Sequence, residues 1–215
     1  MRDLKAAVLA VLVAIVVAEP LGAQLASRSA EEWIKTLDSP NRIAGLRVDE
    51  VVSRLGLKPG QSVVDVGAGT GVFSLALAKA VSPGGTAYAV EVEQGLVDHI
   101  GRKARTENVA NLRTVLGSFT DPNLPVNNVD LAFIHDVLHH IEDRAAYLEN
   151  LARYLNPSAR IVVIDFHPER GGHRGQPELQ VSPERAAQLM AGAGFKPVQT
   201  IDLFEDKYFT VYGRQ

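Results

Sequence analysis

The chain has no cysteine and no run of basic residues, and each absence excludes a class of chemistry. Without cysteine among its 215 residues, it has no disulfide, no thiolate metal ligand and no cysteine nucleophile. Lys and Arg number 22 against 25 Asp and Glu, a formal net charge of −3, so the usual electrostatic attraction for a nucleic acid is missing. The expected partner is a small molecule or a protein, and His, Asp, Glu, Tyr or a cofactor must supply the chemistry.

The first residues differ in character from the rest. Arg2 and Lys5 precede an uninterrupted apolar run at 6–18, and small residues follow as far as Ala23. A basic start, an apolar core shorter than the ~20 residues of a spanning helix and a small-residue cleavage site are typical of a secretory signal. We predict that residues 1–23 are a signal peptide or an uncleaved membrane anchor. The body is then exported, periplasmic or secreted, or anchored outside the cytoplasm; the alternative is a cytoplasmic protein.

The remaining residues suffice for one substantial core. Ser29 and Glu32 have capping-box spacing at the start of a helix, which we expect "SPN" at 39–41 to end. We interpret residues 24–47 as a helical cap and residues 48–215 as the main domain.

Strand and helix signals alternate through the main domain. Apolar runs typical of strands lie at 62–66, 86–92, 112–116, 129–134 and 160–166, and helical patterns at 49–55, 71–82, 94–107, 143–155 and 183–193. This alternation predicts a parallel sheet built from βαβ units. Pro and Asn in residues 117–128 predict a loop in place of the third crossover helix. Two further strand-like runs, joined by a tight turn at Glu205 and Asp206, predict a closing antiparallel hairpin.

The segment "VVDVGAGTGVF" joins the first strand to a helix. Gly67, Gly69 and Gly71 permit a sharp turn and a close ligand approach, and the helix that follows presents free amides. A dinucleotide site requires GxGxxG, whereas the spacing here is GxGxG. Asp65, just before the loop, suits a cationic ammonium better than a pyrophosphate. Glu91 ends the second strand, where it can accept hydrogen bonds from two ribose hydroxyls.

These features, with "LHHI" after the fourth strand and the terminal hairpin, resemble the class I S-adenosylmethionine-dependent methyltransferases of the bacterial small-molecule type, over roughly residues 48–215. The resemblance implies a Rossmann-like α/β fold: a mostly parallel seven-stranded sheet with helices on both faces. Its last strand inserts antiparallel between the fifth and the sixth. The implied cofactor is S-adenosyl-L-methionine. The residues implied to bind it are Asp65, Gly67, Ala68, Gly69, Gly71, Glu91, Val92, Ser118 and Phe119.

The resemblance also implies which residues contact each part of the cofactor. Gly67, Ala68 and Gly69 would pack against its methionine portion, Asp65 would orient the loop or the amino group, and Glu91 would hold the ribose.

The sequence departs from the family after the third strand, where an acidic residue often receives the adenine amine. Here Ser118 can form a hydrogen bond and Phe119 can pack on the purine, while Asp121 is a candidate substitute for the acid. The alternative is that residues 117–121 are simply a turn.

Candidate catalytic residues follow the fourth strand. Methyl transfer from a sulfonium requires alignment of donor and acceptor, and an oxygen or nitrogen acceptor must also lose a proton. His135 and Asp136 lie directly after the strand, and His139 would share a face with His135 if the next turn is helical. We predict that one of these three is the general base, with pocket shaping as the alternative; for His140 we expect pocket shaping.

Metal binding is not expected. The available donors are His135, Asp136, His139, Asp165 and His167. No HExxH or similar spacing organises them into a metal motif.

The expected substrate is a small-molecule acceptor, apolar or membrane-derived, methylated on an O, N or C atom. Trp33, Phe166, Phe204 and Tyr208 either line its pocket or belong to the core. Two other functions stay open: an NAD(P)-dependent oxidoreductase and a non-catalytic S-adenosylmethionine-binding module. The module is considered because export would separate the domain from the cytoplasm, where the cofactor is made.

Overall fold

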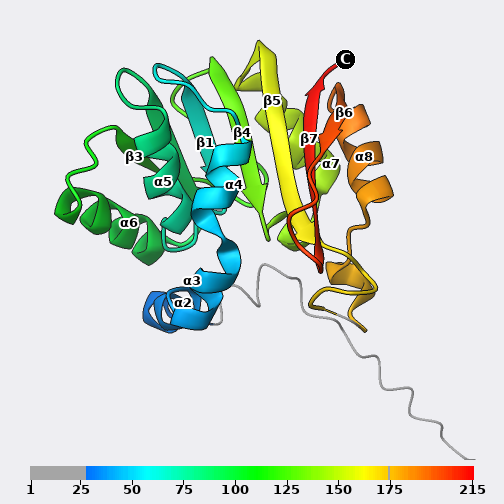
Figure 1. Ribbon diagram of the computed structural model, residues 1–215, viewed down its shortest axis with the longest axis horizontal. Helices are drawn as coiled ribbons and strands as arrows, with labels where there is room; N and C mark the ends of the chain where they lie inside the picture. Colours follow the sequence, from blue (N-terminus) through cyan, green and yellow to red (C-terminus); the bar gives the residue numbers. More distant parts are fainter. Residues whose placement is uncertain (1–27, 174) are drawn as a thin grey trace, which may run out of the picture.

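A seven-stranded sheet forms the centre of the protein (Figure 1). The computed structural model describes residues 28–173 and 175–215. The strands are β1 (Ser62–Val66), β2 (Thr86–Glu91), β3 (Leu112–Leu116), β4 (Val129–His135), β5 (Leu155–Phe166), β6 (Phe195–Thr200) and β7 (Lys207–Arg214). Their order is β3-β2-β1-β4-β5-β7-β6, and β7 runs antiparallel to β5 and β6. The predicted sheet is confirmed, including the last strand inserted between the fifth and the sixth.

Helices cover both faces of this sheet. They are α2 (Ala30–Leu37), α3 (Pro40–Leu46), α4 (Val48–Arg54), α5 (Val72–Ala80), α6 (Gln94–Thr106), α7 (Arg144–Arg153) and α8 (Pro183–Gly192), with short 3-10 turns η1 (Leu138–His140) and η2 (Pro177–Leu179). Val63 and Val64 of β1 belong to different apolar clusters, as alternation along a strand requires. Ile100 of α6 packs in the cluster of Val63 and Leu148 of α7 in that of Val64. The central strands are therefore buried on both sides, which explains their nearly continuous apolar sequences.

The N-terminal part contains one helix more than predicted. The Ser29 hydroxyl accepts a hydrogen bond from the Glu32 amide and the Glu32 carboxylate accepts one from the Ser29 amide, so the capping box of α2 is confirmed. The segment "SPN", however, also begins a helix: Ser39 is the N-cap of α3 and Pro40 its first residue. Proline is favoured at that position because its missing amide has no partner there in any case.

Two connections differ from prediction. Strand β5 begins at Leu155 rather than at residue 160, because Leu155 already pairs with Val129 of β4. The connection between β6 and β7 is not a tight turn but the six residues 201–206, and the Ile201 amide closes it by donating to the Phe209 carbonyl. The segment 117–128 contains no helix, as predicted.

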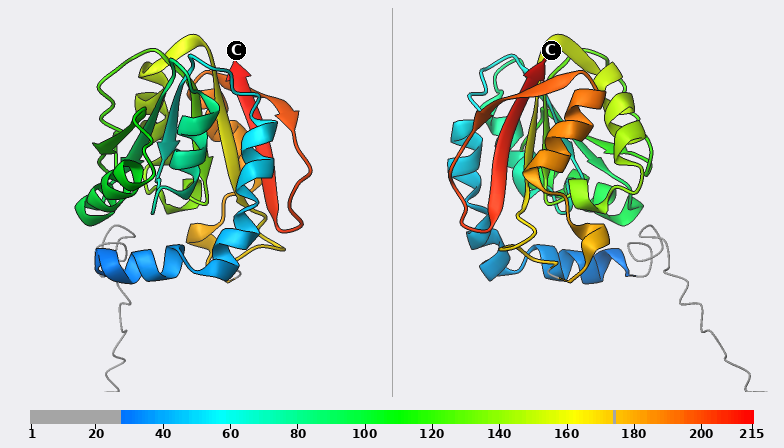
Figure 2. Two further views of the ribbon diagram at one scale, coloured as in Figure 1. Left: turned by 60° about the vertical axis from the view of Figure 1, so that its left-hand side comes forward. Right: turned by 90° about the vertical axis from the view of Figure 1, so that its right-hand side faces the viewer.

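The first two described helices cover one edge of the sheet. Figure 2 shows α2 lying across the end of the molecule where the parallel strands have their carboxyl ends, with α3 leading from it toward α4. No described helix is both long and apolar enough to cross a membrane. The predicted signal or anchor at residues 1–23 lies outside the described residues.

Candidate active site

A cavity lies at the carboxyl ends of β1, β2 and β4. Most residues predicted to bind the cofactor line it: Asp65, Gly67, Ala68, Gly69, Glu91, Val92, Ser118 and Phe119. Helices α2 and α3 close it from the opposite side with Trp33, Leu37, Arg42 and Leu46. This is the edge at which open α/β sheets bind their ligands.

The glycine loop has the conformation that its sequence predicts. Gly67 and Gly69 have φ values of 67° and 58°, and a Cβ added at Gly67 would collide with the Val137 side chain. Gly71 also has a positive φ, 77°, but it does not line the cavity. A Cβ there would come within 3.0 Å of Ile100 Cγ2. Gly71 therefore brings α5 close to α6, while the two earlier glycines shape the cavity.

Two buried carboxylates flank this loop. The Ser74 hydroxyl donates to Asp65 Oδ2 over 2.5 Å, and Glu91 accepts from the amides of Gly69 and Val92 over 2.8 and 2.7 Å. Burial raises the pKa of Asp65 to about 7, opposed by the Ser74 hydrogen bond and reinforced by the negative Glu91. Burial also raises the pKa of Glu91, against the effect of the amides it binds. Such a pair favours a cationic ligand and repels a pyrophosphate.

The segment after β3 is a turn, and it still contributes to the cavity. Ser118 Oγ accepts from the Asp121 amide over 3.0 Å, and the Ser118 amide donates to the Asp121 carbonyl over 2.8 Å. Phe119 is 47% exposed and lines the cavity wall. Asp121 is not among the lining residues, because its carboxylate accepts the Tyr154 hydroxyl at 2.8 Å. On this side of the cavity the turn therefore contributes the aromatic ring of Phe119 and not the carboxylate of Asp121.

His135 ends β4 in an aromatic environment. Its ring lies 4.7 Å from that of Phe73 and 6.1 Å from that of Phe133, measured between centroids. Burial lowers the pKa of His135 to about 4, although the Asp136 charge opposes this. Its Nε2 is buried and has no hydrogen-bond partner within residues 28–173 and 175–215. At neutral pH His135 is therefore an uncharged imidazole and a weak base that retains a free hydrogen-bonding atom.

Asp136 follows His135 along the chain. Its backbone has a positive φ of 56°, and its carboxylate forms an ion pair with Lys207. Lys207 Nζ donates to the Oδ2 of Asp136 over 2.7 Å, while Asp136 Oδ1 is buried and has no partner in the described part of the chain. Burial opposes ionisation of Asp136, but His135 and Lys207 together hold its pKa below the ordinary value. His135 and Asp136 both line the cavity. At neutral pH both groups are therefore unprotonated, and Asp136 is the one that carries a charge.

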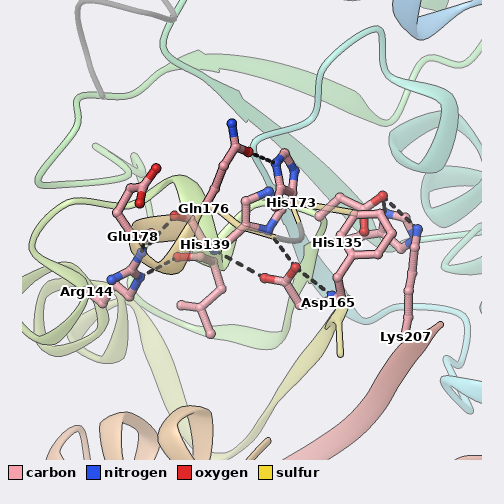
Figure 3. Close-up of polar contacts among 11 residues, drawn as sticks. His135, His139, Arg144, Asp165, His173, Gln176, Glu178 and Lys207 are labelled. Carbon is pink, nitrogen blue, oxygen red and sulfur yellow. Dashed lines mark hydrogen bonds and ion pairs between the residues drawn. The ribbon is translucent and has the colours of Figure 1, made fainter. Parts of the chain in front are cut away.

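His139 lies apart from this pair. The turn after Val137 is only the short η1, and His139 Nδ1 is bonded to Asp165 Oδ1 at 2.6 Å, so it shares no helical face with His135 (Figure 3). His140, rather than His139, lines the cavity. The described structure also brings His173 beside these two histidines. Sequence reasoning missed this, because the long glycine-containing loop before η2 carries no spacing that indicates a contact with η1.

The aromatic residues predicted for an acceptor pocket separate into different roles. Trp33 lines the cavity. Phe166 and Phe204 instead pack against Lys207, whose Nζ lies 4.6 and 5.5 Å from their ring centroids. Tyr208 is buried in the core. Phe166 pairs with Lys207 in the antiparallel register of β5 and β7, and this register positions the lysine beside Asp136.

Comparison with known proteins agrees with this geometry. Residues 64–163 match the family described as "Methyltransferase domain". A solved structure of a SAM dependent methyltransferase from Aquifex aeolicus superimposes with a TM-score of 0.78 at 26% identity, covering 87% of this chain and 100% of that one.

Curated relatives are similar over part of their length. A demethylmenaquinone methyltransferase of Geobacillus sp. (strain WCH70) is 24% identical over 140 residues, 63% of this chain and 60% of the relative. A phosphoethanolamine N-methyltransferase of Triticum aestivum is 29% identical over 180 residues, 77% of this chain and 34% of the relative. The chain therefore spans between about a third and three fifths of these relatives.

Proposed function

Because this chain belongs to the class I S-adenosylmethionine-dependent methyltransferases, we propose that it transfers a methyl group from S-adenosylmethionine to a small-molecule acceptor. The observation that carries the proposal is the pair of buried carboxylates, Asp65 and Glu91, on either side of a glycine loop. A ligand with an ammonium group, a ribose and no phosphate matches this pair. A nicotinamide dinucleotide does not, because its pyrophosphate would meet two carboxylates.

The chain's own residues are suited to hold such a cofactor. Asp65 would accept a hydrogen bond from the ammonium group, and Glu91 would accept from the ribose hydroxyls with the lone pairs that the two backbone amides leave free. Gly67 lets the loop lie closer to Val137 than a residue with a Cβ could, and the Phe119 ring in the cavity lining would pack against the purine. When bound, S-adenosylmethionine supplies the electrophilic methyl group.

Two unpartnered atoms in the cavity lining support a position for the acceptor. His135 Nε2 and Asp136 Oδ1 are buried and lack partners among the described residues, so a hydroxyl or amine of the acceptor can satisfy them. Asp136, kept ionised by Lys207, takes the proton as the acceptor oxygen or nitrogen is methylated, and His135 orients the acceptor. His139, bonded to Asp165, is assigned a supporting role.

The proposed acceptor is apolar and derived from a membrane. Trp33, Leu37 and Leu46 of the cap supply an apolar wall, and one relative is named a demethylmenaquinone methyltransferase. The basic and apolar pattern of residues 1–23 supports an exported or membrane-anchored protein, which would meet such an acceptor at the membrane.

Calorimetric titration with S-adenosylmethionine, S-adenosylhomocysteine and NADH tests the proposal. We expect both sulfur ligands to bind in the micromolar range, NADH not to bind, and Glu91→Gln to weaken binding while the exposed Glu107→Gln does not. Preferential binding of NADH would support an oxidoreductase. Binding without transfer of a labelled methyl group to any apolar hydroxyl or amine acceptor would support the non-catalytic module.

A further inference from the structure

Three imidazoles converge beside the cavity. His139, His140 and His173 each offer a ring nitrogen, and these nitrogens lie within 4.8 Å of one another. The His139 ring centroid lies 4.1 Å from that of His140 and 4.8 Å from that of His173. We propose that these three histidines bind a divalent transition metal ion of the Zn²⁺ type.

His139 is oriented as a metal ligand requires. Asp165 accepts from its Nδ1 over 2.6 Å, which fixes a proton there and leaves Nε2 as the ring atom available to a metal ion. Asp165 is itself held, because its oxygens also accept from the amides of His139 and Phe166 over 3.1 and 2.8 Å. Asp165 and His139 are 1% and 2% exposed, so this arrangement is shielded from water. A carboxylate behind a histidine is the usual outer support of a zinc site.

His173 is fixed by its own loop. Its Nδ1 is bonded to Gln176 Oε1 at 3.0 Å, which again leaves Nε2 free. Its carbonyl accepts from Gln180 Nε2 over 2.9 Å. Its backbone has φ 61°, a conformation that costs energy for a residue other than glycine and is enriched at functional sites. The loop also packs tightly on Phe166, since a Cβ added at Gly171 would collide with that ring.

Arg144 ties the two parts of the site together. Its guanidinium donates to the carbonyls of Leu138 and His139 in η1 and to the carbonyl of Glu178 in η2, over 2.7 to 3.0 Å (Figure 3). The turn that carries two of the histidines is thereby joined to the loop that carries the third.

The donor set determines the class of ion. Three imidazole nitrogens suit Zn²⁺ and related transition metals rather than Mg²⁺ or Ca²⁺, which prefer oxygen. Zn–N bonds of about 2.0–2.1 Å in a tetrahedral site place the nitrogens roughly 3.4 Å apart, so the rings must approach by roughly 1 Å, a movement within the reach of side-chain rotation. Three protein ligands leave one position for water or an acceptor oxygen, and His140 lines the cavity.

Metal titration tests this site. The full chain, without a histidine tag, is titrated with Zn²⁺ by calorimetry and with Co²⁺ by visible absorption. We expect a single ion per chain with micromolar or tighter affinity, and the intense absorption of a tetrahedral Co²⁺ complex. His173→Ala and His140→Ala should each lower the affinity on the order of 100-fold, and Asp165→Asn by 10- to 100-fold (roughly).

His167→Ala is the matched control, because His167 lies at the start of the same loop but contacts Tyr208 and should bind Zn²⁺ as the parent does. Circular dichroism verifies the fold of each variant. Millimolar binding by the parent, or unchanged binding by His173→Ala and His140→Ala, would overturn the proposal. The site stands independently of the proposed function, since calorimetry with S-adenosylmethionine reports on Asp65 and Glu91, which do not belong to the histidine cluster.

Discussion

Cofactor affinity should depend on pH through Asp65. In the free protein this carboxyl group has a pKa of about 7, because it is buried beside a second carboxylate. The ammonium group of S-adenosylmethionine would favour the charged form and lower that pKa. Below pH 7 the cofactor must displace a proton to bind, whereas above pH 7 it meets a carboxylate that is already ionised. Affinity should therefore rise with pH and fall as the solution becomes acidic.

The magnitude follows from the pKa. If only the ionised form binds, the dissociation constant at pH 5.5 exceeds that at pH 8 by about 30-fold, or about 2 kcal/mol. Glu91, whose pKa is also raised by burial, acts in the same direction. His135, with a pKa of about 4, stays neutral over this range and contributes nothing.

Calorimetry measures this linkage directly. Titrations from pH 5.5 to 8.5, repeated in two buffers with different ionisation enthalpies, report both the affinity and the protons released. We expect release to approach one proton near pH 6 and to vanish near pH 8.5 (about one unit or more from the pKa). Asp65→Asn should weaken binding at pH 8 and abolish most of the pH dependence. An affinity that is flat in the parent, or a dependence that persists in Asp65→Asn, would refute the reasoning.

Three further outcomes are expected. Asp65→Asn should raise the thermal midpoint of the cofactor-free protein at pH 8 and increase its free energy of unfolding by up to ~4 kcal/mol. The reason is that a carboxyl group whose pKa is higher in the folded state makes the protein less stable as the pH rises from about 4 to 7; a lower midpoint would contradict this. Gly67→Ala should destabilise the protein by about 1–3 kcal/mol in urea unfolding, since its Cβ meets Val137 and φ is positive, and adding Val137→Ala should restore part of the loss. Lys207→Met should raise the pKa of Asp136, so the acidic limb of the kcat/KM profile should move to higher pH, whereas Lys207→Arg should leave it in place.

The fold was accessible from the sequence because its signals are local and repeated. The central strands are apolar runs separated by helix patterns, except for the loop before β4, and burial on both faces makes these runs nearly continuous. The helix α3 was missed because Pro40 is equally typical of a helix end and of a helix start, and only the packing of Leu46 decides between them.

The sequence predicted those site residues that lie at or next to the carboxyl ends of recognisable strands. The glycine loop, Asp65 and Glu91 could be placed because strand ends meet at one edge of a parallel sheet. The ion pair of Asp136 with Lys207 depends on the register of β5 with β7, and sequence alone does not give that register. The meeting of His173 with His139 depends on a loop conformation that hydrogen bonds of Arg144 and Gln180 maintain.

The position of β7 also has a consequence for biosynthesis. This strand follows the other six along the chain, yet it pairs with β5 on one side and β6 on the other. When only the first six strands have been synthesised, the sheet is therefore incomplete: β5 has an unpaired edge, and β6 has no neighbouring strand. Such a chain gains its cooperative stability only when the last strand emerges.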